Sequence, residues 1–288
     1  MTELTHESTC RELPTSQGVL RYHEAGEGPP VVLLHGSGPG VTGWRNFRDN
    51  LAVFAEHHRT LIFEFPGFGV SDDSGEHPMM GAAGSVVRFL DELGLERAHL
   101  VGNSMGGMIA CKVAMASPDR VDRLVTIGGV GRNLFAPAPA EGLRLLVEFA
   151  EDPTRARLVQ WLEGMVYNPG ILTEELIEER WQLASDPEVL ESTRRIFSKA
   201  AMGAIMAAAE SAANSGVTPD WAKLHTIGAP TLLTWGRDDR VTPLDSSLIP
   251  MRTIPDAQLH VFPNCGHWVQ IEAKAAWEST VLAFLAQG

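Results

Sequence analysis

Cysteine, long apolar runs and positive charge are all scarce in this chain of 288 residues. Cys10, Cys111 and Cys265 are too few and too scattered for a disulfide framework or a zinc site, and an odd count suits a reducing compartment. No apolar run reaches the roughly 18 residues of a membrane span, and the N-terminus lacks the basic region and apolar core of a signal peptide. We therefore expect a cytoplasmic protein that does not cross a membrane.

Positive charge is scarce because 36 acidic residues outnumber 23 lysines and arginines, which gives a formal net charge of -13. A polyanion would be repelled by such a chain, so neither nucleic acid nor an anionic membrane surface is an expected partner. The histidines, including His57 and His58, lack the spacing to carboxylates or thiols that a metal site needs. With 44% apolar and 20% charged residues, the composition is that of a globular protein.

Short apolar runs that end in glycine-rich turns predict a mostly parallel, doubly wound α/β sheet. The first 17 residues are polar and without periodicity, and we expect a loosely held arm there. An alternating strand is expected over 19–24, and another strand just before Gly102. The remaining predicted strands are Val31–Leu34, Leu61–Phe65, Leu124–Ile127, Pro230–Trp235 and Leu259–Phe262.

Residues 134–216 contain no buried strand run and are helical in pattern. We expect a helical cap here, inserted between a first core part over 1–133 and a second over 217–288. The predicted cap helices are Leu143–Ala150, Arg155–Met165, Glu174–Ala184, Pro187–Phe197 and Ala200–Ala213.

Ser104 lies at the centre of a G-x-S-x-G pattern that runs from Gly102 to Gly106. This pattern holds a serine on a strained corner between a strand and a helix, with its hydroxyl exposed. Glycine is needed at both flanks because a side chain there would clash with a neighbouring strand or helix. The pattern alone is common. An apolar strand precedes this one and an apolar-periodic helix follows it, so we predict Ser104 as a nucleophile.

An aspartate and a histidine follow Ser104 at the ends of two later predicted strands. Asp239 stands three residues after Gly236 and four before Pro243, a spacing that resembles the acid loop of the α/β-hydrolases. The neighbouring Asp238 is interpreted as a loop carboxylate. His267 follows the last predicted strand. Serine, acid and histidine in this order resemble the triad of that superfamily, in which serine attacks, histidine moves the proton and the carboxylate fixes the imidazole tautomer.

A glycine-rich loop follows the predicted strand that ends at Leu34, over residues 35–40. It lacks the lysine and the hydroxyl residue of a phosphate-binding P-loop. Such a loop can instead aim backbone N–H groups at a developing oxyanion. The predicted donors are the N–H of Ser37 and the N–H of Met105, directly after the nucleophile.

A serine nucleophile excludes the dehalogenase and epoxide-hydrolase branches, which use aspartate, and leaves esters, lactones, peptides and carbon–carbon bonds. Several motifs together resemble the meta-cleavage product hydrolases, which split 2-hydroxy-6-oxohexa-2,4-dienoates in bacterial aromatic or steroid degradation. The motifs are Gly38-Pro39-Gly40 with Gly43-Trp44-Arg45-Asn46, Gly102–Gly107, Trp235–Arg240 and Cys265–Trp268, and Arg180-Trp181 matches the family's Arg-Trp pair.

The resemblance implies an α/β-hydrolase fold and cleavage of a small-molecule dienoate to a carboxylic acid and 2-hydroxypenta-2,4-dienoate. It implies no metal or cofactor, and it implies a homodimer or larger homo-oligomer. In family terms Arg180, Asn103 and Asn46 bind the dienoate end by charge-assisted hydrogen bonds, and Trp268 packs on the conjugated chain. The other expected substrate-binding residues are Gly38 and Val241.

Two residues depart from the family pattern, and alternatives stay open. Glu64 stands where aspartate is common, and Val241 stands where an aromatic residue is common, so the group on C6 of the substrate is undecided. Arg180 has a second interpretation as a solvated charge that pairs with the glutamates beside it. A carboxylesterase or enol-lactone hydrolase with the same triad is the alternative function. A binding protein on the same fold is the third, and the intact triad argues against it.

Overall fold

The computed structural model describes residues 4–73, 75–135, 139–216 and 218–287. Its strands form one sheet in the order β1-β2-β4-β3-β5-β6-β7-β8. β1 and β2 pair antiparallel, β2 pairs antiparallel with β4, and all further neighbours are parallel. The strands are Cys10–Thr15 (β1), Gly18–Ala25 (β2), Pro30–Leu34 (β3), Arg59–Glu64 (β4), Ala98–Asn103 (β5), Val121–Ile127 (β6), Thr231–Gly236 (β7) and Ala257–Phe262 (β8).

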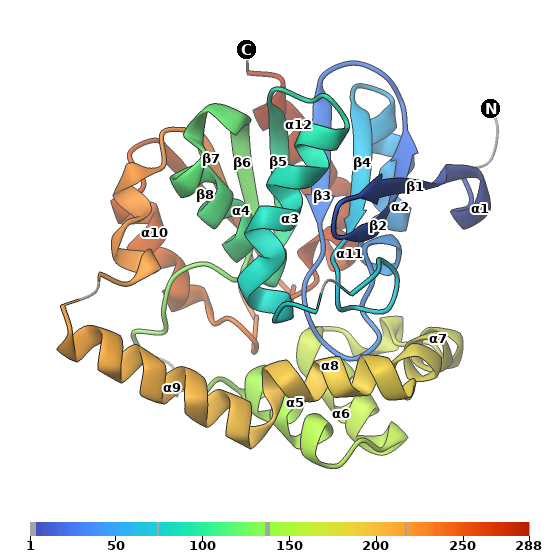
Figure 1. The fold of residues 1–288 in the computed structure, drawn as a ribbon, viewed down its shortest axis with the longest axis vertical. Coiled ribbons are helices and arrows are strands. Elements are labelled where there is room, and N and C mark those ends of the chain that lie inside the picture. Colours follow the sequence, from blue (N-terminus) through green and yellow to red (C-terminus); the bar gives the residue numbers. More distant parts are fainter. Residues whose placement is uncertain (1–3, 74, 136–138, 217, 288) are drawn as a thin grey trace.

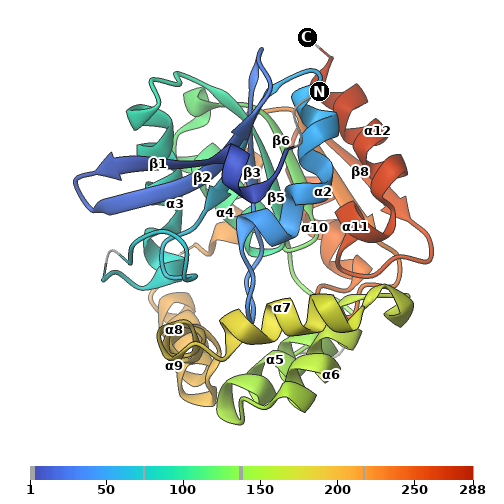
Figure 2. The same ribbon diagram turned by 90° about the vertical axis from the view of Figure 1, so that its right-hand side faces the viewer.

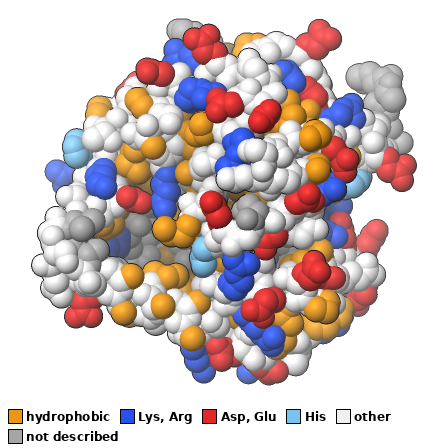
Figure 3. All heavy atoms as spheres, in the orientation of Figure 1, with side chains coloured by type: hydrophobic (Ala, Val, Ile, Leu, Met, Phe, Trp, Pro, Cys, Tyr) orange, Lys and Arg blue, Asp and Glu red, His pale blue; other side chains and the backbone are white. Residues whose placement is uncertain are grey.

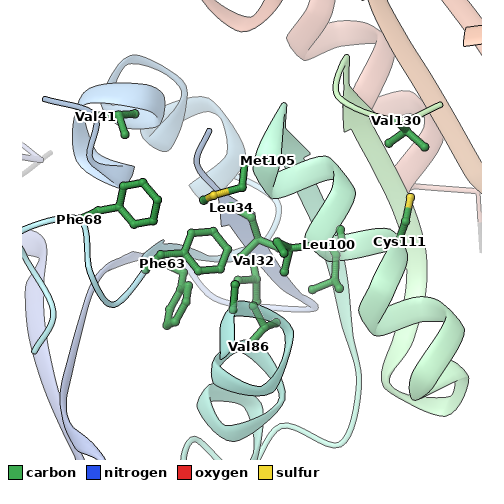
Figure 4. Close-up of a cluster of buried hydrophobic side chains, with 14 of the residues drawn as sticks. Val32, Leu34, Val41, Phe63, Phe68, Val86, Leu100, Met105, Cys111 and Val130 are labelled. Atoms are coloured by element: carbon green, nitrogen blue, oxygen red, sulfur yellow. The ribbon is translucent and has the colours of Figure 1, made fainter. Parts of the chain in front are cut away.

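Helices cover both faces of this sheet (Figures 1 and 2). α3 (Pro78–Glu92) and α4 (Met105–Ala116) lie on one face, and α2 (Gly43–Ala55) and α12 (Lys274–Leu285) on the other. Residues 31–34 of the central strand β3 are all apolar and 0% exposed, as expected for a strand that is buried on both faces. Figure 4 shows part of the core under α3 and α4, where Val32 and Leu34 meet Phe63 and Leu100.

The N-terminal segment differs from the sequence prediction. Residues 1–3 lie outside the described part, but α1 (His6–Thr9) and β1 follow at once, so the expected loose arm over 1–17 is wrong. β1 is an edge strand whose side chains are mostly exposed, and it therefore lacks an apolar signal. Backbone pairing with β2 holds it, and the Thr9 hydroxyl lies 2.9 Å from His23 Nδ1.

In the described part of the segment between β6 and β7, five α-helices cover one end of the sheet (Figure 1). No strand occurs among the described residues of this segment. Apolar side chains remain exposed on the last helix, where Ile205 is 48% and Met206 71% exposed (Figure 3). The helices are α5 (Glu141–Glu151), α6 (Arg155–Met165), α7 (Glu174–Ala184), α8 (Pro187–Phe197) and α9 (Lys199–Asn214).

Two further short α-helices are α10 (Leu248–Thr253) and α11 (Val269–Glu272). Within the described ranges, no helix combines the length and apolar character required to cross a membrane.

Candidate active site

Ser104 occupies a sharp corner between β5 and α4. Its φ of 53° and ψ of -113° are unusual for a residue with a side chain. A Cβ on Gly102 would lie 2.3 Å from the Gly106 carbonyl, and one on Gly106 would lie 2.1 Å from Leu34 O. The Ser104 N–H donates to Ile127 O of β6 at 2.8 Å. Close backbone packing thus holds the serine in its strained conformation, as the pattern predicts.

His267 and Asp239 form a buried pair at the ends of β8 and β7. His267 Nδ1 lies 2.7 Å from Asp239 Oδ2, and both side chains are 1% exposed. Asp239 also accepts from the N–H groups of Val241 and Thr242, and from the Thr242 hydroxyl at 2.9 Å. The carboxylate thus places the imidazole proton on Nδ1 and leaves Nε2 as a base.

The β6 turn separates this pair from the serine. A Cβ on Gly129 would lie 2.1 Å from Ser104 O, and one on Gly128 would lie 3.3 Å from His267 Cε1. The turn that carries Ser104 and the turn that carries His267 therefore lie on either side of Gly128 and Gly129. The Ser104 side chain has no hydrogen-bond partner among the described residues. Catalytic hydrogen bonds often tighten only when substrate binds.

The loop after β3 is held at Gly36 from two sides. The Gly36 N–H donates to Asn46 Oδ1 at 3.0 Å, and the Gly36 carbonyl accepts from His35 Nδ1 at 2.6 Å. His35 Nε2 accepts the Phe65 N–H, so this imidazole is neutral, and burial lowers its pKa to about 4. These bonds orient the peptide that carries the Ser37 N–H. The Gly36 Cα position faces the serine, because a Cβ there would lie 3.4 Å from Ser104 Cβ.

Arg180 is buried on α7, with only 3% of its surface exposed. Its Cζ lies 5.2 Å from the centre of the Trp268 ring, and its Nη1 is buried without a hydrogen-bond partner among the described residues. Burial, together with the charge of Arg45, lowers the Arg180 pKa to about 9. A buried guanidinium with an unsatisfied N–H group can bind an anion.

The solvated interpretation of Arg180 is wrong. Glu174 and Glu178 of the same helix pair with Arg155 instead. Glu179 pairs with Arg45 at 3.0 Å and also binds Arg48. The helical spacing is compatible with pairs to Arg180, but the fold turns this residue inward and the glutamates outward.

The other expected substrate-binding residues lie on several elements. Asn103 Nδ2 donates to Ile127 O at 3.3 Å, and its Oδ1 lies 2.9 Å from the Cβ position of Gly36. A Cβ on Gly38 would lie 2.5 Å from the Trp161 ring of α6. Val241 packs on α5, where a Cβ on Gly142 would lie 2.4 Å from it. Gly38 and Val241 thus both contact the helices between β6 and β7.

Glu64 has a structural contact that explains a carboxylate at this position. Its two oxygens accept the N–H groups of Gly43 and Trp44 at 2.6 and 2.8 Å, at the N-terminus of α2. Burial raises the pKa of Glu64 to about 7. α2 carries Asn46, so Glu64 supports the helix that holds the glycine loop.

Thr242, Trp161 and the role of His35 were not predicted from the sequence. Thr242 lies between the acid and the following proline, where a hydroxyl three residues after Asp239 was the available signal. No sequence signal pointed to Trp161, because its contact with Gly38 joins segments that are far apart along the chain. No group of three or more metal-binding side chains occurs within the described ranges.

Comparisons with known proteins agree with this geometry. A family model described as alpha/beta hydrolase fold matches residues 29–274. The 2-hydroxy-6-oxo-6-phenylhexa-2,4-dienoate hydrolase of Burkholderia cepacia is 38% identical over 299 residues, with 100% of both chains covered. The chain belongs to the meta-cleavage product hydrolases. The predicted family and the predicted α/β-hydrolase fold are therefore confirmed.

Other meta-cleavage product hydrolases are similarly close. The 2-hydroxy-6-oxononadienedioate/2-hydroxy-6-oxononatrienedioate hydrolase of Comamonas testosteroni is 38% identical over 299 residues, again with 100% of both chains covered. The solved meta-cleavage product hydrolase of Pseudomonas fluorescens IP01 has a TM-score of 0.85 at 30% identity, with 97% of this chain and 98% of that chain covered.

Proposed function

We propose that this member of the family hydrolyses a carbon–carbon bond of a 2-hydroxy-6-oxohexa-2,4-dienoate, and that Ser104, His267 and Asp239 carry the reaction. The products are a carboxylic acid and 2-hydroxypenta-2,4-dienoate. Full-length relatives at 38% identity that bear such names support the substrate class. The buried Asp239–His267 pair and the strained Ser104 support the nucleophilic mechanism.

The observation that carries the proposal is the unpaired Arg180. A simple ester offers no anion to a buried guanidinium, whereas a dienoate offers a carboxylate and an enol or enolate oxygen. Binding this end replaces the water that Arg180 has lost, by charge-assisted hydrogen bonds. A role for Trp268 is supported by its position, because the centre of its ring lies 5.2 Å from Arg180 Cζ, and in the proposal this ring packs on the conjugated chain.

The chemistry then follows in order. The dienol is first converted to its keto tautomer, which makes C5 a feasible carbanion leaving group. His267 Nε2 takes the Ser104 proton as Oγ attacks the C6 carbonyl, and the N–H groups of Ser37 and Met105 receive the oxyanion. The C5–C6 bond breaks, C5 leaves as the dienolate and is protonated, and water hydrolyses the acyl group from Ser104.

The helices over residues 134–216 serve in this proposal as a cap that closes the substrate pocket. Val241 and Gly38 support this role because both pack against cap helices. One relative is named for a substrate with a phenyl group on C6, and another is named for a nonadienedioate, so their named substrates differ in the substituent on C6. A panel of phenyl, alkyl and carboxylated C6 substrates therefore identifies the substituent, with the highest kcat/KM marking the preferred one.

We also propose a cytoplasmic homodimer or larger homo-oligomer without metal or cofactor. Three free cysteines support a reducing compartment. Light scattering on the purified protein measures the oligomeric state, and a monomer at micromolar concentration contradicts it.

Arg180→Ala provides the direct test of the function. The wild type is expected to bleach the yellow dienolate of 2-hydroxy-6-oxo-6-phenylhexa-2,4-dienoate. The variant should lose about 100-fold or more in kcat/KM, because truncation removes a charge-assisted contact to the substrate. Its activity on p-nitrophenyl acetate should stay within about 3-fold, because this ester has no carboxylate.

The matched control is Arg157→Ala, which removes a cap arginine that pairs with Glu148 and Asp152 at the surface. This control should retain both activities. If the whole dienoate panel persists while the ester is cleaved rapidly, the protein is the alternative carboxylesterase or enol-lactone hydrolase.

A further inference from the structure

Glu272 joins two distant segments through its carboxylate. The residue ends α11, a few positions after the candidate base. Its Oε2 accepts the Gly266 N–H at 2.7 Å. Its Oε1 accepts the N–H groups of Tyr167 and Asn168 at 2.8 and 3.0 Å. One side chain thus satisfies three backbone donors, one next to His267 and two in the segment between α6 and α7.

The same two segments also touch directly. The His267 N–H donates to Met165 O at 2.7 Å, at the end of α6. A Cβ on Gly266 would lie 2.8 Å from Met165 O and from Tyr167 N. The cap backbone therefore rests on the turn that carries the imidazole, with no space between them for a side chain at position 266.

The ionised form of Glu272 is disfavoured at its position. Burial raises the pKa of Glu272, the three N–H donors only partly offset this, and the charge of Asp239 raises the pKa further. A partly buried carboxylate near a second carboxylate is unfavourable unless its contacts compensate. Here those contacts are the N–H groups of the two segments.

We propose that Glu272 is a positioning residue for His267, which it orients by fastening the Gly266–His267 turn to cap residues 165–168. The imidazole is held at Nδ1 by Asp239, and the position of Nε2 then depends on where the backbone of this turn lies. The closed cap and the aligned base are thereby parts of one arrangement. This inference rests on the proposed roles of Ser104 and His267.

The test uses Glu272→Gln in the full-length protein. The amide nitrogen cannot accept a hydrogen bond, so either Gly266 or the cap segment loses its partner. Two rates are measured: kcat for the phenyl-substituted dienoate, and the second-order rate of Ser104 labelling by a fluorophosphonate. Both should fall by about 10- to 100-fold, the usual effect of a small misplacement of a catalytic group. KM for the dienoate should change less than kcat, because the proposed carboxylate-binding Arg180 lies on α7, outside the Gly266–His267 turn.

Two further variants separate positioning from stability. Glu272→Asp keeps the charge, but its shorter side chain moves the carboxylate oxygens away from the three N–H donors. Both rates should therefore fall in this variant as well. Glu278→Gln removes another buried carboxylate, which binds Asn50 and Lys274, and it should leave both rates unchanged.

The proposal is overturned if Glu272→Gln and Glu272→Asp keep both rates and lose only melting temperature, because Glu272 is then merely structural. A wild type that reacts with the fluorophosphonate but leaves every dienoate intact refutes the proposed function instead. In that case the labelling rates of the variants still decide the role of Glu272.

Discussion

The two halves of the proposed triad are built by different means. The Asp239 carboxylate, which orients the His267 imidazole, accepts hydrogen bonds from four donors within 2.9 Å: His267 Nδ1, the Thr242 hydroxyl, and the N–H groups of Val241 and Thr242. Ser104 is held by backbone crowding, because the carbonyls of Leu34 and Gly106 leave no room for a Cβ at its flanking glycines. The serine side chain itself has no such partner in the described part of the chain.

The two halves should therefore respond differently to substitution. The acid–base half can lose function through a change of a single atom, with the fold intact. The serine half is part of the β5–α4 junction, so a change there disturbs the core before it disturbs the chemistry. Two substitutions test this contrast, and a third tests the support of the glycine loop beside the serine; they follow in order of decreasing expected effect.

Asp239→Asn should have the largest effect on catalysis. The amide group can donate to the imidazole and so favours the wrong tautomer, in which Nε2 carries the proton. In serine proteases the corresponding change lowers kcat by about 10,000-fold with intact geometry. We expect a loss of similar order in dienoate hydrolysis, with a melting temperature close to that of the wild type. A variant that retains a tenth of the activity would refute the assignment of Asp239 as the acid.

Gly106→Ala should instead damage the fold. The new Cβ would lie 2.1 Å from Leu34 O, which belongs to a central strand and cannot yield cheaply. We expect about 3 kcal/mol of destabilisation in urea unfolding, near the upper end for overpacking. Gly84→Ala is the control, since a Cβ there meets nothing within 4 Å in α3, and it should be neutral or stabilising. Equal stability of both variants contradicts the crowding argument.

Glu64→Gln tests the support of the glycine loop through its pH dependence. Burial raises the pKa of Glu64 to about 7 from its ordinary 4.5, so the native state retains a proton that the unfolded chain has released. This contribution to stability is complete below pH 4.5 and is lost as the pH rises through 7.

Glutamine does not titrate, so the stability advantage of the wild type over this variant should shrink between pH 5 and pH 8. We expect a change of about 1 to 3 kcal/mol, measured by urea unfolding at the two pH values. His23 and His35, whose pKa values are lowered to about 4 by burial, stay neutral in the folded wild type over this range. A constant difference between wild type and variant would contradict the raised pKa.

Much of the fold could be predicted because the signals are local. Buried strands are largely apolar runs, and the bounds of α6, α7 and α8 agree with the predicted ranges. β1 was missed because an edge strand is held by its backbone, and α2 was not predicted at all. The family motifs identified the residues around Ser104, but the pairing of Glu64 with the N-terminus of α2 joins positions that have no local signal.

The chemical groups of the site could be read from the amino-acid sequence: a serine in a glycine corner, an acid and a histidine in the order of a triad, and an arginine in the cap segment. Which charges are buried depends on the three-dimensional packing. Arg180 faces inward and its neighbouring glutamates pair elsewhere, and Glu272 reaches across about a hundred residues to the cap. Burial and backbone contact depend on the packing of segments that are distant in sequence, and the spacing of residues within one helix does not predict that packing.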